Sequence, residues 1–224
     1  YISPLEVVEL AENNQLGLPF GRWLLQRLKQ DLYKLPDEMR EHLYFSINVS
    51  PSQFTPRLPN SLAKWLADAP ISADQLLLEM TESISVANFN ECQGILQQIN
   101  ALGVDIALDD FGTGYSSLSY LSSLKVQRIK IDKSFIQGIS QDLQMQRVVR
   151  SIIELCHGFN FSVICEGIED RADDQQIRSL GSDYAQGYFY GRPMALPGLI
   201  AWYSENRPQL LFSAREMHDH HVRH

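Results

Sequence analysis

Six short apolar runs alternate along this chain with segments in which apolar residues recur at helical spacing. Strands that alternate with helices in this way form a parallel sheet, because each helix carries the chain back to the same edge of the sheet. The runs predict strands over residues 43–48, 75–80, 104–108, 127–132, 161–166 and 183–185. The segments between them predict helices over residues 4–13, 19–35, 58–68, 89–102, 115–124 and 144–158, and a last one that ends near Leu180.

Polar residues stand where the predicted strands end, and six different strands contribute to the set. In a closed (β/α) barrel, active sites are assembled at that rim from the ends of several strands. An open doubly wound sheet would instead carry a glycine-rich loop after its first strand, and the sequence has no such loop there. We therefore expect one α/β domain built as a TIM-like barrel. The residues at the predicted rim are Asn48, Glu79, Asp109, Asp110, Lys130, Glu166 and Gln186.

Two adjacent carboxylates, Asp109 and Asp110, follow the apolar run at 104–108. Side by side in a partly buried place they repel each other strongly unless they share a cation. The loop after them, residues 111–117, holds two glycines and several hydroxyl side chains, so it can approach a phosphate or a metal closely. The pair predicts a divalent metal site, and the alternative is an Asp-Asp turn that caps the next helix.

The predicted rim offers carboxylate and amide oxygens, which are the donors that Mg²⁺ and Mn²⁺ prefer. Two such ions close together can clamp the attacking and leaving oxygens, so the set predicts hydrolysis of a phosphate ester. Lys130 would orient or polarise the attacking water, or balance phosphate charge. The alternatives are structural: Lys130 could pair with a carboxylate inside the barrel, and Asn48 and Gln186 could be turn residues. Glu82 could simply start the next segment.

The net charge and the cysteines restrict the class of protein further. A formal net charge of −8 over 224 residues argues against sequence-independent binding to DNA, so metal ions or a few placed cations would hold a phosphate-bearing ligand. Cys92, Cys156 and Cys165 have no CxxC spacing and fall in predicted helices or strands, as reduced core residues do. No apolar run has transmembrane length. We expect a cytoplasmic protein or the cytoplasmic domain of a membrane-anchored one.

Six motifs stand in order along the chain. They are NVSP at 48–51, LEMTES at 78–83, LDDFGTGYSSL at 108–118, IKIDK at 129–133, CEGIE at 165–169 and AQGYFYGRP at 185–193. Together they resemble the EAL-domain cyclic di-GMP phosphodiesterases of bacteria, from Tyr1 to about Tyr203. The resemblance implies a (β/α)8-type barrel that cleaves cyclic di-GMP to linear pGpG at a two-metal site with Mg²⁺ or Mn²⁺.

The resemblance also implies which residues hold the metals. Asn48, Glu79 and Asp109 would ligate the first ion. Asp109 would bridge to a second ion, which Asp110 and Glu166 would help to hold.

Four further residues receive roles from the resemblance. Lys130 would act on the nucleophilic water, and Gln186 would lie in the shell of metal-bound water. Glu82 would hold the loop at 111–117, which couples the site to the second subunit of a homodimer. Arg192 and the aromatic residues around it would support the guanine end of the substrate.

The Glu-Ala-Leu segment that names the family would precede the helix that starts near Ser3, and it is not among these residues. We expect the sequence to begin inside the domain, with that metal-ligating glutamate and the first two barrel strands upstream. Residues 1–206 would then be an N-terminally incomplete EAL domain and 207–224 a polar tail. Sensory or GGDEF-type domains could share the polypeptide. The alternative functions are a receptor that binds cyclic di-GMP without cleaving it and a protein-interaction barrel with a vestigial site.

Overall fold

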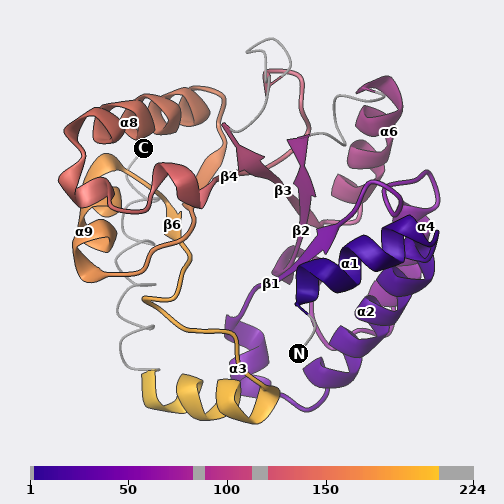
Figure 1. Cartoon of the computed structure of the whole chain (residues 1–224). Coiled ribbons are helices and arrows are strands. Elements are labelled where there is room, and N and C mark those ends of the chain that lie inside the picture. Colours follow the sequence, from indigo (N-terminus) through magenta and orange to yellow (C-terminus); the bar gives the residue numbers. More distant parts are fainter. Residues whose placement is uncertain (1–2, 83–88, 113–120, 207–224) are drawn as a thin grey trace.

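The computed structural model describes residues 3–82, 89–112 and 121–206, and one parallel sheet runs through them. Its strands follow each other in chain order, and each neighbouring pair is parallel. The sheet curls into a half-barrel with helices around its outer side (Figure 1). The strands are β1 (Phe45–Val49), β2 (Leu76–Thr81), β3 (Asp105–Phe111), β4 (Arg128–Ile131), β5 (Ser162–Cys165) and β6 (Tyr184–Ala185).

Helices connect the strands and precede the first of them. The α-helices are α1 (Pro4–Asn13), α2 (Gly17–Leu32), α3 (Asp37–His42), α4 (Leu58–Leu66), α6 (Phe89–Asn100), α8 (Leu143–Gly158) and α9 (Arg171–Leu180). Short 3-10 turns are η1 (Ala73–Gln75), η2 (Lys133–Phe135) and η3 (Ile139–Gln141). A further helix covers residues 196–206.

The predicted strands are all confirmed, with ends that differ by a few residues. The predicted helices are confirmed in the same way, except that the one at 115–124 lies mostly outside the described residues. Two helices were not predicted. The first, α3, has six residues of which only Met39 is buried, so it lacks the repeated apolar positions that reveal a helix. The second is the helix at 196–206.

The predicted end of the central strand was wrong. It was placed at Leu108, but β3 continues through both aspartates to Phe111. Thr81 pairs with Asp109, and the register against β4 then shifts between Leu108 and Phe111. Such a bulge lets a strand accommodate an extra residue, here Asp110 with a φ of 56°. Local periodicity cannot reveal it, because it depends on pairing with the neighbouring strand.

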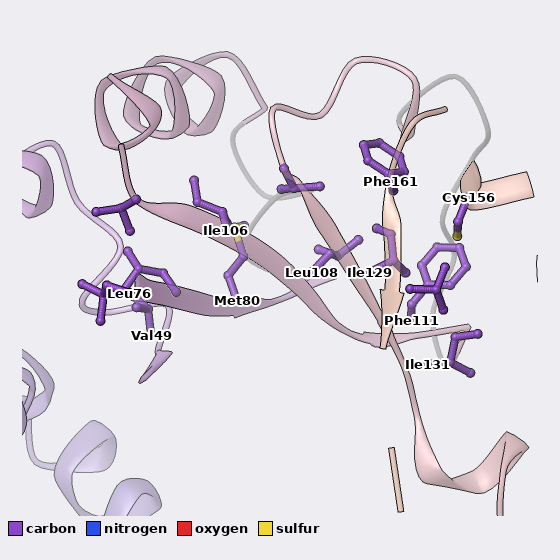
Figure 2. Close-up of a cluster of buried hydrophobic side chains, with 14 of the residues drawn as sticks. Val49, Leu76, Met80, Ile106, Leu108, Phe111, Ile129, Ile131, Cys156 and Phe161 are labelled. Carbon is purple, nitrogen blue, oxygen red and sulfur yellow. The ribbon is translucent and has the colours of Figure 1, made fainter. Parts of the chain in front are cut away.

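The two faces of the sheet differ in character. One face carries large apolar side chains packed against the helices, and Figure 2 shows this core. The other face has a small separate apolar cluster, Leu77, Ala107 and Ile164. Side chains alternate along a strand, so residues two positions from these lie on this second face. The hollow of the half-barrel is therefore where charged side chains on β2, β3 and β4 are directed. Core residues on the first face include Leu76, Met80, Ile106, Leu108, Ile129 and Ile131.

Side-chain caps begin several helices. In the sequence, Ser3 followed by Pro4 and, three residues after Ser3, by Glu6 predicts a capped helix start for α1. The structure confirms it, since Ser3 Oγ accepts from the backbone of Glu6 and the Glu6 carboxylate accepts from the backbone of Ser3. Asp142 caps α8 by accepting from the backbone N–H groups of Gln144 and Met145, each at 2.9 Å. These bonds satisfy donors that a helix cannot satisfy internally.

Replacing Asp142 with alanine should lower the free energy of unfolding by about 1 kcal/mol, because two N–H groups of α8 lose their acceptor. Asp142→Asn is the matched control, since its side-chain oxygen can still accept. Urea unfolding followed by circular dichroism measures both variants. Equal midpoints for the alanine and asparagine variants would show that the cap contributes nothing.

The three cysteines are free and buried, as predicted for core residues. Cys92 lies in α6, Cys156 in α8 and Cys165 in β5. Burial raises the pKa of the Cys92 thiol to about 11, so it stays protonated at neutral pH. Within the described ranges, no helix combines the length and apolar character needed to cross a membrane.

Candidate active site

The register of the first three strands places the predicted rim residues on one face. Asn48 of β1 pairs with Glu79 of β2, and Thr81 of β2 pairs with Asp109 of β3. Glu79 and Thr81 are two positions apart and so share a face. Asn48, Glu79 and Asp109 therefore lie together on the hollow side of the half-barrel, toward the C-terminal ends of their strands.

Lys130 of β4 contacts three carboxylates on this face. Its Nζ is 2.5 Å from Oε2 of Glu79 and 3.2 Å from Oδ1 of Asp109, and it also contacts Oε1 of Glu166 just after β5. Lys130 exposes 2% of its surface and Glu79 5%, so these ion pairs are largely shielded from water. The structure thus brings together four of the predicted residues from four successive strands, and we call this group the Lys130 cluster.

The Lys130 cluster carries more negative than positive charge. Burial raises the pKa of Glu166 to about 7, against the opposing effect of Lys130. Burial also works against the charge on Lys130, but Glu79, Asp109 and the hydrogen bond to Glu166 outweigh it and raise the pKa of the ammonium. Lys130 therefore remains a charged donor at neutral pH, and it cannot serve as a base there.

Asp110 lies beside this cluster at the bulge of β3. It is exposed, and its backbone N–H donates to Oδ1 of Asp109 at 3.0 Å. Partial burial and the charges of Asp109 and Asp132 raise its pKa. Asp132 itself caps η2 through the backbone N–H of Ser134 at 2.9 Å. Asp110 thus adds negative charge at the rim, where a cation would relieve the repulsion.

The donor chemistry of these residues fits a divalent cation. Carboxylate and amide oxygens suit Mg²⁺ and Mn²⁺, and the surplus of negative charge would favour binding. Within the described part of the chain, no group of three or more acidic, His or Cys side chains is gathered closely enough to form a metal site. The Lys130 ammonium contacts three of the carboxylates instead. The predicted metal ligands are Asn48, Glu79, Asp109, Asp110 and Glu166.

Gln186 and Arg192 lie in the segment after β6. The backbone N–H of Gln186 donates to Cys165 O at 2.9 Å, and its carbonyl accepts from the N–H of Ile168 at 3.1 Å. This segment is therefore fixed against the end of β5, next to the Lys130 cluster. The Arg192 guanidinium lies 4.5 Å from the ring centroid of Tyr188, and both side chains are exposed. The aromatic neighbour expected for Arg192 is present.

Glu82 is buried directly after β2. Most of the loop that it is predicted to hold, residues 113–117, lies outside the described residues. The role of Glu82 therefore stays a prediction.

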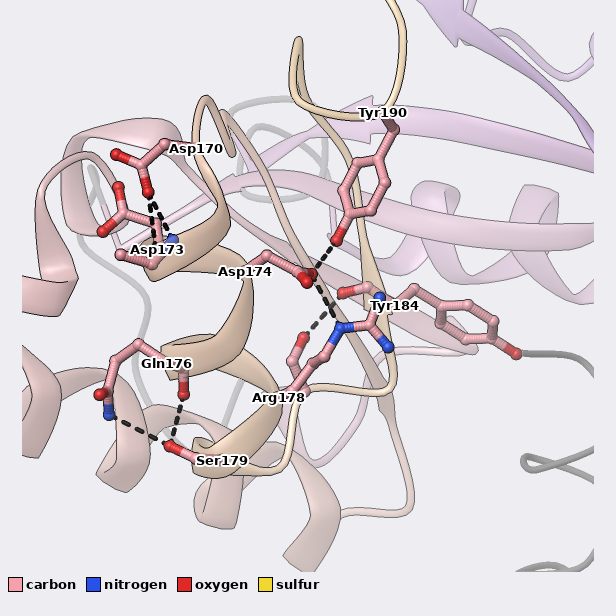
Figure 3. Close-up of polar contacts among 10 residues, drawn as sticks. Asp170, Asp173, Asp174, Gln176, Arg178, Ser179, Tyr184 and Tyr190 are labelled. Atoms are coloured by element: carbon pink, nitrogen blue, oxygen red, sulfur yellow. Dashed lines mark hydrogen bonds and ion pairs between the residues drawn. The ribbon is translucent and has the colours of Figure 1, made fainter. Parts of the chain in front are cut away.

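Asp174, which lies in α9, was not among the residues predicted from the sequence. Its Oδ1 accepts from Arg178 Nε at 2.8 Å and from the hydroxyl of Tyr190 (Figure 3). The contact ties the segment that carries Gln186 to α9. The local sequence does not reveal the contact with Tyr190, because Tyr190 lies beyond the next strand.

The family model described as EAL domain matches residues 1–193. The bifunctional diguanylate cyclase/cyclic di-GMP phosphodiesterase MucR of Pseudomonas aeruginosa is 33% identical over 201 residues, covering 89% of this chain and 29% of that protein. The cyclic di-GMP phosphodiesterase PdeF of Escherichia coli K12 is 35% identical over 196 residues, covering 87% and 26%.

A solved structure of a related protein has a similar fold. The PaMucR phosphodiesterase in complex with c-di-GMP superposes with a TM-score of 0.80 at 33% identity, covering 88% of this chain and 87% of that one. The parallel α/β half-barrel therefore matches the TIM-like barrel of that family. The chain spans between a quarter and a third of the length of the two curated relatives.

Proposed function

This chain belongs to the EAL-domain family, and from that membership we propose that it hydrolyses cyclic di-GMP to linear pGpG. The curated relatives named above are cyclic di-GMP phosphodiesterases, and one solved relative binds c-di-GMP. The observation that carries the proposal is the Lys130 cluster, in which a buried ammonium and three carboxylates meet at the C-terminal ends of the strands. Active sites of such barrels are built at that position.

The reaction needs a divalent cation, for which we propose Mg²⁺ or Mn²⁺ at two sites. Asn48, Glu79 and Asp109 would hold the first ion, and Asp109 would also contribute to the second. Asp110 and Glu166 would complete the second site. Bound there, the ions would supply Lewis acidity and would lower the pKa of an attacking water. The excess of carboxylates over Lys130 supports the assignment, because it leaves negative charge for cations to neutralise.

Lys130 acts as a hydrogen-bond donor in this proposal. Its raised pKa keeps the ammonium protonated, so it orients the attacking water and offsets the charge that develops on the phosphate. Gln186 donates to water at the rim, and Arg192 with Tyr188 supports the guanine end of the substrate. Glu82 holds the loop at 111–117, through which a homodimer forms.

The wider organisation is proposed on the same basis. Residues 1–206 form the EAL domain and 207–224 a tail. Other signalling domains accompany it in the polypeptide, as the relatives are several times longer than this chain. A second candidate function is a receptor that binds cyclic di-GMP without cleaving it. It predicts binding without turnover.

We expect the full-length polypeptide to convert cyclic di-GMP to pGpG in Mg²⁺ or Mn²⁺ and to lose this activity in EDTA. Chromatography of the nucleotides measures the conversion, and binding in Ca²⁺ is recorded alongside. Binding without turnover in either metal would favour the receptor, and neither binding nor turnover would contradict both.

Asp109→Asn should lower turnover by about 100-fold or more, because it removes charge from the ligand shared by both proposed ions. Asp105→Asn is the matched control, since Asp105 lies on the same strand and pairs with Arg128 at 2.9 Å, away from the Lys130 cluster. Initial rates at saturating Mn²⁺ measure both. Turnover at the wild-type rate in the Asp109→Asn variant would contradict the proposed mechanism.

A further inference from the structure

The loop after Asn48 is fixed by a carboxylate from α1. Oε1 of Glu12 accepts from Ser50 Oγ at 2.5 Å and from Ser52 Oγ at 2.7 Å. Ser50 lies two positions beyond Asn48, and its carbonyl accepts from the N–H of Gln53 at 3.0 Å. One half-buried carboxylate oxygen thus holds two hydroxyls of a single turn.

The start of α2 approaches the same turn closely. A Cβ added to Gly17 would lie 1.9 Å from Ser52 Oγ and 2.5 Å from Glu12 Oε1, so a side chain at this position would displace both groups from their contact. Gln53 Nε2 donates to the carbonyl of Gly17 at 3.1 Å, and Gln53 Oε1 accepts from the N–H of Ser50 at 3.4 Å. The junction of α1 and α2 therefore packs directly on the turn that follows β1.

This packing affects Asn48 because the turn that α1 and α2 hold directly follows β1, the strand that carries Asn48. β1 pairs with β2, and Asn48 is exposed at its end. We propose that Glu12 is a positioning residue: by holding Ser50 it fixes Asn48 where its amide oxygen ligates the metal. The inference rests on the proposed function. Residues that orient metal ligands typically change metal affinity when they are replaced.

The test measures Mn²⁺ binding to the full-length polypeptide by isothermal titration calorimetry, without nucleotide. Glu12→Ala and Ser50→Ala should each weaken Mn²⁺ binding about 10-fold or more. The double variant should bind about as weakly as either single one, because both substitutions break the same contact. Glu9→Ala is the control, since Glu9 is an exposed residue on the same helix, and it should bind as the wild type does.

The outcomes separate this inference from the function on which it rests. A wild type that fails to bind Mn²⁺ would overturn the proposed metal site itself. A wild type that binds, with Glu12→Ala and Ser50→Ala equally tight, would overturn only the role of Glu12. The role of Glu12 would also be overturned if the double variant lost Mn²⁺ affinity by the product of the two single losses. Glu12 would then act independently of Ser50. Ser50→Ala removes one hydroxyl and leaves α1 intact, so it tests the proposal even if Glu12→Ala does not fold.

Discussion

Replacing Lys130 with methionine should lower turnover of cyclic di-GMP by about 100-fold or more, because the donor that we propose orients the attacking water is lost. Methionine has a similar length and no charge, so the change leaves Glu79, Asp109 and Glu166 without the ammonium that contacts them. Removing one partner of a buried ion pair typically costs about 3–5 kcal/mol. We therefore expect a loss of stability in the metal-free protein as well.

The stability loss in Lys130→Met should depend on pH. Burial already raises the pKa of Glu166 from 4.5 to about 7 in the presence of Lys130. A carboxyl whose pKa is raised on folding favours the folded state below pH 4.5, and that advantage is lost as pH rises through about 7. Without the Lys130 ammonium, the charged form of the Glu166 carboxyl is even less favourable in the folded state. The variant should therefore lose more stability at pH 8 than at pH 5.

Nucleotide chromatography and urea unfolding in EDTA measure the two effects. The control is Lys125→Met, which replaces an exposed lysine shortly before β4 and should leave both quantities near their wild-type values. A Lys130→Met protein that retains half of its turnover would remove Lys130 from the mechanism. Equal stability losses at pH 5 and pH 8 would contradict the electrostatic explanation.

Replacing Gly187 with alanine should destabilise the fold by about 3 kcal/mol or more. An added Cβ would lie 2.1 Å from the carbonyl oxygen and 2.3 Å from the nitrogen of Ile168. These backbone atoms cannot give way easily, because the Ile168 N–H donates to Gln186 and its carbonyl accepts from Phe189. The alanine would push the segment that carries Gln186 away from the end of β5, so turnover should fall as well.

Gly94→Ala in α6 is the matched control, because a Cβ there meets no atom within 4 Å. Alanine is the better helix former, so this substitution should raise the free energy of unfolding by up to about 1 kcal/mol. Urea unfolding measures both variants. Unfolding midpoints that move by the same amount in the same direction would show that the contact with Ile168 does not restrict residue 187.

Much of the fold was predictable because its signals are local. The strands were found from short apolar runs, and helices such as α8 from apolar residues at helical spacing. The cap at Ser3 was found from the spacing of Ser3, Pro4 and Glu6. Missed elements, such as α3, lack such signals. The rim position of Glu79 and Lys130 also followed from the sequence, since a residue at the end of a parallel strand must lie at the C-terminal edge.

By itself, the sequence determined the order of strands and helices and which polar residues end each strand, since these depend on neighbours along the chain. Only the tertiary structure decided which side chains meet. The contact between Lys130 and Glu79 depends on the register of three strands, and that of Glu12 with Ser50 joins residues 38 positions apart. The bulge at Asp110 depends on pairing with β4. Contacts between distant segments depend on packing and register, which no local pattern specifies.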